Sequence, residues 1–256
     1  MKKITILLLP LFFTLVALAQ TPKQKIVKIM YKSIPVSQYC IPKSQTISRP
    51  ERGSDLDLLS GYKTYYDLFI NLDTRSSIYT FDSLVTTKIK GREGDNVSIA
   101  DEIRFVYRPA GNVTYKSESV MGQPFVTKGA VGDIEWVITN EKKQMFGFEC
   151  TKAVSKNKDL MMTVWFTNAI PVSSGPAIYF GLPGLVVWAE DFFRTTQIEK
   201  IEYSADVSGF EEKLKKLETD YGKNPKKTFT KESVLIIKKT DLGLVLLKMI
   251  KAEDQK

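Results

Sequence analysis

The residue types that carry most enzymatic chemistry are scarce in this sequence. The 256 residues include no histidine and only two cysteines. A serine or cysteine nucleophile that depends on an imidazole base is therefore excluded, as are the zinc sites that histidine completes. The sequence also lacks the Gly-x-x-x-x-Gly-Lys-Ser/Thr and Gly-x-Gly-x-x-Gly loops that cradle phosphates. We expect no cofactor and no metal site.

Chemistry based on carboxylates alone stays open, because the chain has 29 aspartate and glutamate residues and a pair of them suffices for glycoside hydrolysis. Glu190 and Asp191 are the one adjacent pair beside a glycine-rich stretch. Neighbouring residues on a strand point to opposite faces, so these two acids would not act together. We interpret them as charges at the end of a strand and assign no catalytic residue.

Cys40 and Cys150 leave two alternatives open. In an exported chain they can form a single disulfide bridge. By closing a loop of about 110 residues, the bridge would stabilise the fold by about 4–5 kcal/mol in the chain-entropy model. The alternative is a pair of buried thiols that pack as small apolar side chains.

The first 19 residues have the features of a signal peptide. Lys2 and Lys3 precede an apolar run over residues 4–18, and Ala17-Leu18-Ala19 supplies the small residues of a cleavage site. The run contains a proline and is short for a membrane span, which takes about 20 residues. We expect residues 20–256 to form a single exported domain with no transmembrane segment, located in the periplasm, at the outer membrane or outside the cell.

The formal net charge of +8 has a local origin, because lysines are concentrated between Lys213 and Lys251. A face of this kind can attract anionic lipids or polyanions. Basic and acidic residues alternate here and arginines are not clustered, which favours a solvated lysine-rich face. We do not expect nucleic acid as a partner of an exported chain.

Alternation of apolar and polar residues predicts a mainly β fold. Half-buried strands with one wet face, typical of antiparallel sheets, are expected near residues 27–31, 62–70, 103–108, 133–139, 146–151 and 160–167. Apolar residues at Phe210, Leu214 and Leu217 predict a helix, and a second helix is expected over residues 230–239. We expect one strongly curved, half-barrel-like antiparallel sheet with one or two C-terminal helices, arranged across its concave face.

Glycines and prolines are concentrated in the stretch from Gly175-Pro176 to Gly181-Leu182-Pro183-Gly184-Leu185. Together with Trp165-Phe166-Thr167 before it and Gly147–Ala153 further upstream, this stretch resembles the GLPGLI family of exported bacterial proteins. Val186 stands where the family motif has isoleucine. The resemblance implies kinship but no mechanism, since no activity is established for the family.

The stretch itself predicts a corner between two strands. Prolines stop the preceding strand, and glycines at 175, 181 and 184 allow positive φ. Pro183 and Gly184 suit positions i+1 and i+2 of a type II turn. Residues 185–189 are apolar on both faces, which predicts a strand covered on both sides.

Two roles are open for this corner. In the structural one, Leu182 fills the end of the core while the glycines let the backbone lie against Trp165 or Trp188. In the functional one, the corner forms a fixed lip of an apolar groove that accepts a ligand or a partner chain. The residues concerned are Trp165, Gly175, Pro176, Gly181, Leu182, Pro183, Gly184, Leu185 and Trp188.

Export, the missing catalytic groups and the apolar corner together favour a non-enzymatic binding protein. Its partner would be an apolar small molecule or an outer-membrane protein. The alternatives are a carboxylate-based enzyme such as a glycan hydrolase, in which two acids would lie about 5–10 Å apart, and an assembly factor for an outer-membrane transporter.

Overall fold

A computed structural model gives the fold, and it describes residues 25–35, 61–87, 103–120, 123–191, 194–203, 205, 207, 209–223 and 228–229. The expected signal peptide, Cys40 and the helix expected over residues 230–239 lie outside these residues. The described residues form twelve strands, one 3-10 turn and one α-helix: β1 Ile26–Ile34, β2 Tyr62–Asn71, β3 Ser77–Thr86, β4 Ile103–Arg108, β5 Val113–Val120, β6 Gln123–Ala130, β7 Trp136–Met145, β8 Phe148–Ser155, η1 Lys158–Leu160, β9 Thr163–Thr167, β10 Leu185–Glu190, β11 Thr195–Glu202, α2 Phe210–Lys223 and β12 Thr228–Phe229.

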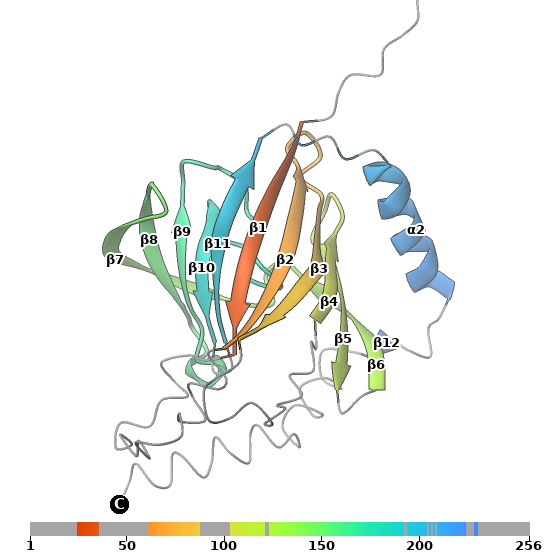
Figure 1. Cartoon of the computed structure of the whole chain (residues 1–256), viewed down its shortest axis with the longest axis horizontal. Helices are drawn as coiled ribbons and strands as arrows, with labels where there is room; N and C mark the ends of the chain where they lie inside the picture. The colour runs from red at the N-terminus through yellow and green to blue at the C-terminus, as the bar shows by residue number, and fades with distance from the viewer. Residues whose placement is uncertain are drawn as a thin grey trace, which may run out of the picture.

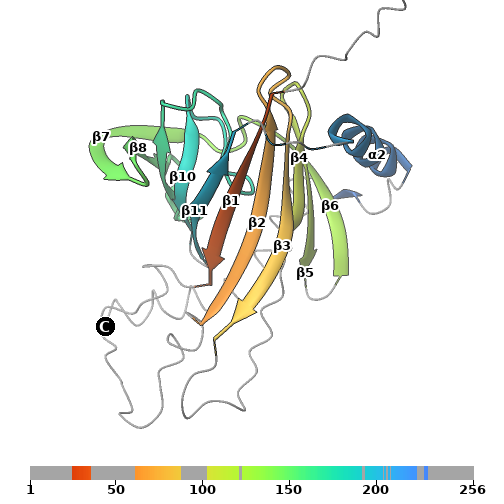
Figure 2. The same cartoon turned by 45° about the horizontal axis from the view of Figure 1, so that its top comes forward.

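All the strands belong to one sheet, in the order β12-β6-β5-β4-β3-β2-β1-β11-β10-β9-β8-β7. Every neighbouring pair is antiparallel except β12 and β6, which pair in parallel over two residues. The sheet is strongly curved and its two ends stay apart, so it does not close into a barrel (Figures 1 and 2). The expected mainly β, half-barrel-like architecture is confirmed.

The main core covers one face of the sheet. Ile29 and Tyr31 of β1, Leu68 of β2 and Val106 of β4 are at most 3% exposed and belong to one buried cluster. The segment 168–184, which joins β9 to β10, supplies Phe180 and other apolar side chains to the same cluster. This segment therefore covers the main core, and the sheet curves around it.

Helix α2 lies on the opposite face, outside the curve (Figure 1). Phe210 and Leu214 pack with Ile78 and Tyr107, whereas Tyr79 and Val106, the neighbours of these two strand residues, face the main core. Successive strand residues point to opposite faces, so the expected position of a helix across the concave face is wrong. The concave face is occupied by segment 168–184, which leaves the helix only the outer one.

Strand β9 is shorter than the alternation predicts. It begins at Thr163, because residues 158–160 form a 3-10 turn and Met161 adopts a φ of +49°. Leu160 and Met162 therefore fit the alternation of apolar and polar residues in the sequence, but they lie before the strand begins. In the part of the chain that the structure describes, we find no helix long and apolar enough to cross a membrane.

Tyr31 links strands that are far apart in the sequence. Its phenol is fully buried and donates a hydrogen bond of 2.7 Å to the carbonyl oxygen of Val186 on β10. Burial raises the pKa of Tyr31 well above its ordinary value of 10.0, because the phenolate would be poorly solvated.

This linkage predicts a fall in stability at high pH. Because the folded-state pKa is raised, the free energy of unfolding should be constant below about pH 10 and decrease as the pH rises above it. Tyr31→Phe should lower that free energy by about 1–2 kcal/mol at pH 7 and make its decrease above pH 10 shallower. Urea unfolding between pH 7 and 11 measures both; parallel pH curves for the two proteins would contradict the assignment.

Candidate functional site

Segment 168–184 folds back onto the strands that it connects. Leu185 N donates to Ile170 O at 3.1 Å and Val186 N donates to Ser174 O at 2.9 Å. Gly181 N donates to the hydroxyl of Ser173 at 3.0 Å. These bonds satisfy backbone groups that the sheet does not pair, so the segment is held as a compact, non-repetitive unit.

Two glycines allow this packing by close approach. A Cβ at Gly184 would overlap the backbone carbonyl of Thr167, lying 2.6 Å from its carbon. A Cβ at Gly175 would overlap the carbonyl oxygen of Tyr179 and lie 2.6 Å from the Cβ of Val186. No side chain fits at either position, which is why the sequence has glycine there.

The sequence prediction for these glycines is partly wrong. Gly181 has the expected positive φ, +94°, but Gly175 and Gly184 do not adopt a positive φ. The expected type II turn at Pro183-Gly184 is therefore absent, since it requires positive φ at its second central residue. The glycines also do not meet the tryptophans that were expected: Gly181 approaches Trp136, and Gly184 approaches Thr167.

Trp165 and Trp188 lie opposite one another on β9 and β10 and are partly buried against the main core. Neither is among the nearest neighbours of Gly175, Gly181 or Gly184. The corner instead uses Trp136, at the start of β7, whose indole Nε1 donates to the carbonyl oxygen of Phe180 at 2.9 Å. Trp136 was not predicted as a site residue, because its position in an alternating strand gave no sign of a bond 44 residues away.

Leu182 fills a second apolar cluster. It is 2% exposed and packs with Val164, Phe166 and Val186, with Trp136 at the edge of the group. Leu185 is fully buried in the main core. These positions favour the structural role that the sequence left open for Leu182.

Tyr179 and Asp191 form a polar contact beside this cluster. The phenol of Tyr179 donates to the Asp191 carboxylate at 2.6 Å, and Arg194 N donates to the same carboxylate at 3.0 Å. Burial, with the negative charge of Asp191 second, raises the pKa of Tyr179 well above 10.0. Tyr179 therefore stays protonated and acts as a donor, and its bond to Asp191 helps to hold the segment in position.

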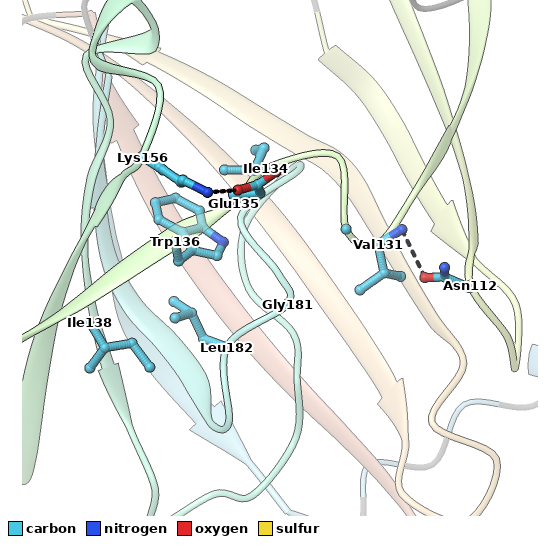
Figure 3. Close-up of a pocket in the computed structure, with 10 residues that line it drawn as sticks. Asn112, Val131, Ile134, Glu135, Trp136, Ile138, Lys156, Gly181 and Leu182 are labelled. Carbon is cyan, nitrogen blue, oxygen red and sulfur yellow. Dashed lines mark hydrogen bonds and ion pairs between the residues drawn. The ribbon is translucent and has the colours of Figure 1, made fainter.

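A hollow of about 580 Å³ lies between this corner and the end of β6 (Figure 3). Trp136, Ile138 and Leu182 line one side of it, and Val131 and Asn112 lie across from them. Val131 N donates to the side-chain oxygen of Asn112 at 3.1 Å. The full lining is Asn112, Val131, Gly132, Ile134, Glu135, Trp136, Ile138, Lys156, Gly181 and Leu182.

The charged groups of the hollow neutralise one another. Glu135 is its single acidic residue and makes a 2.6 Å ion pair with Lys156, its single basic residue. The hydrogen bond from Lys156 and its charge lower the pKa of Glu135, and the same pair raises the pKa of Lys156. Because the pair is solvent-exposed, it contributes little to stability. The hollow therefore presents polar and apolar surface in similar amounts, and its two charged side chains are paired with each other.

Cys150 is buried in the main core and forms no disulfide with another described residue, and burial raises the pKa of its thiol. Its Sγ donates to Phe148 O at 3.5 Å. Cys40 lies outside the described residues, so the bridge between the two cysteines stays a prediction. Among the described residues, no group of three or more acidic or cysteine side chains is arranged to hold a metal ion.

Comparison with protein families gives one match over a short stretch of the chain. A family described as "Protein of unknown function (Porph_ging)" matches residues 154–188, the stretch that contains β9, segment 168–184 and the first four residues of β10. No curated protein matches the chain. The chain is thus similar, over this stretch, to a family without an assigned function.

Comparison with solved structures gives three distant matches. Two structures of PNGF-II are 14% identical to this chain, with TM-scores of 0.45 and 0.43. The first alignment covers 81% of this chain and 31% of the PNGF-II chain, and the second covers 72% and 29%. An uncharacterized conserved protein from Thermus thermophilus is 6% identical with a TM-score of 0.34, and the alignment covers 74% of this chain and 85% of that one. The chain therefore spans about a third of the length of the PNGF-II chains.

The close backbone approach at Gly184 gives a stability prediction. Gly184→Ala should lower the free energy of unfolding by about 1–3 kcal/mol, because the new methyl group overlaps the Thr167 backbone. Gly132→Ala is the matched control, since a Cβ there meets nothing within 4 Å, and should change stability by less than about 0.5 kcal/mol. Urea unfolding compares the two; equal stabilities would show that the approach is not required.

Proposed function

We propose that this chain is an exported binding protein of the GLPGLI family that holds the apolar part of a ligand in the hollow beside segment 168–184. The observation that carries the proposal is the hollow itself. Its volume of about 580 Å³ falls within the range of about 300–1,000 Å³ found for small-molecule sites. The signal-peptide features of residues 1–19 support export to the periplasm or the outer-membrane surface.

The chemistry of the lining supports an apolar ligand. Trp136, Ile138 and Leu182 present apolar surface, and the indole N–H of Trp136 is already bonded to Phe180 O. The two charges at the lip are paired with each other. A ligand with an apolar body would therefore displace water from the hollow without having to break a strong polar contact.

The residues that form the wall of the hollow are held in place by packing, which favours binding by a preformed site. Gly181 lies with its φ of +94° against Val131 O and Trp136, and Leu182 is fixed in the core. A rigid wall of this kind reduces the entropy that binding must overcome. Ile138, by contrast, is 50% exposed and forms the accessible rim where a ligand would enter.

The proposal is tested by titrating the mature protein with the apolar dye N-phenyl-1-naphthylamine and following its fluorescence. Ile138→Asp should weaken binding at least about tenfold, because it places a charge on the apolar rim. Val137→Asp is the matched control: Val137 is 46% exposed, adjacent in sequence, and not part of the lining. The free energy of unfolding of both variants should lie within about 0.5 kcal/mol of that of the parent protein.

Three results would contradict the ligand proposal: no saturable dye binding, equal loss in both variants, or loss in Val137→Asp alone. The last result would place the dye on the exposed surface of β7 and not in the hollow. β7 is the end strand of the sheet and Val137 is exposed on it, and an end strand with exposed apolar side chains is a surface on which another chain can add a strand.

A further inference from the structure

A buried arginine ends strand β4. Arg108 is 7% exposed and pairs in register with Ser77 of β3. Alternation places its side chain on the same face as Val106, which is part of the main core. A permanently charged group thus lies at the end of an apolar row, where charge is costly unless it is compensated.

The contacts of Arg108 leave this charge incompletely satisfied. Its Nη2 donates to the carbonyl oxygen of Arg75 at 2.7 Å. Its Nε is buried and has no acceptor among the described residues. One neutral carbonyl therefore serves a guanidinium that has five N–H donors.

The surroundings add positive charge. Burial, with the nearby charge of Arg75 second, lowers the pKa of Arg108 below its ordinary value. None of the ion pairs in the described part of the chain includes Arg75 or Arg108. Two cationic side chains therefore lie near each other, and no carboxylate among the described residues makes an ion pair with either of them.

Hydroxyl groups lie at the same end of the sheet. In the turn between β2 and β3, the hydroxyls of Thr74 and Ser76 are 2.7 Å apart, and Ser76 is 3% exposed. The Asn71 side chain accepts hydrogen bonds from the backbone N–H groups of Asp73 and Thr74, at 2.9 and 3.1 Å. The turn that carries Arg75 is therefore fixed by its own hydrogen bonds, and it also carries two hydroxyl groups.

We propose that the β2–β3 turn and the end of β4 bind a phosphate group, with Arg108 as the buried ligand and Arg75 as the exposed one. A guanidinium fits phosphate oxygens with two parallel N–H bonds, and such charged bonds are stronger than neutral ones. The site is separate from the hollow, because neither arginine lines it, so the proposal does not depend on the proposed function.

Isothermal titration calorimetry of the full mature chain with inorganic phosphate tests this site, at ionic strength held constant with chloride. The parent protein should show one saturable site. Arg108→Met should raise the dissociation constant for phosphate at least about tenfold. Glycerol phosphate in a parallel titration separates two sources: binding of both ligands indicates a site for a phosphorylated headgroup, and binding of inorganic phosphate alone indicates a site for the free ion.

A second variant keeps the test decisive if Arg108→Met does not fold. Arg75 is exposed and has a φ of +59°, a conformation that asparagine tolerates well. Arg75→Asn should therefore retain the fold and the backbone carbonyl, and weaken phosphate binding about threefold. Lys143→Met removes an exposed charge on β7 as a control and should have no effect. Absence of saturable binding in the parent, or equal affinities in Arg75→Asn and Lys143→Met, would overturn the proposal.

Discussion

The fold depends on how closely the backbone of segment 168–184 approaches the sheet. At Gly184 the chain runs against the carbonyl of Thr167, and at Gly175 it runs against Val186, with no room for a Cβ at either contact. These contacts let the segment turn back inside the curved sheet. Because the segment fills the concave side, Phe180 and Leu182 reach buried clusters, and helix α2 packs on the outer face.

The same constraint produces the hollow. Once Gly181 is held beside Val131 and Trp136, the start of β7 and the end of β6 face each other across a gap that the segment only partly fills. Trp136 is oriented by its bond to Phe180 O, and Tyr179 by its bond to Asp191. The polar contacts of this region therefore serve to hold apolar surface in place, which agrees with a role in binding.

Much of this architecture follows from local patterns in the sequence. Alternation over residues 62–70 and 103–108 predicts the strands β2 and β4, but the expected wet face of β4 is wrong, because Val106 and Tyr107 are buried on opposite faces of the sheet. The spacing of Phe210, Leu214 and Leu217 predicts α2, because these residues pack on one side of the helix. The position of the helix is not predicted, since it depends on which face segment 168–184 has already covered.

The candidate sites are less predictable, because their contacts join distant residues. The glycine-rich stretch is identified correctly as a corner, but composition cannot distinguish a glycine needed for positive φ, such as Gly181, from one needed for close approach, such as Gly184. The role of Trp136 depends on a bond across 44 residues. Arg108 resembles any outward-facing residue of an alternating strand until the curvature of the sheet buries it.

The most direct measurement of the central claim, that the hollow beside segment 168–184 binds an apolar ligand, is the NMR signal of the Trp136 indole N–H. In the free protein this proton should exchange slowly with solvent, because it is bonded to Phe180 O. Addition of an apolar ligand should shift this signal progressively to saturation while the indole signals of Trp165 and Trp188 change little. A Trp136 signal that stays unchanged while the ligand binds would contradict the account.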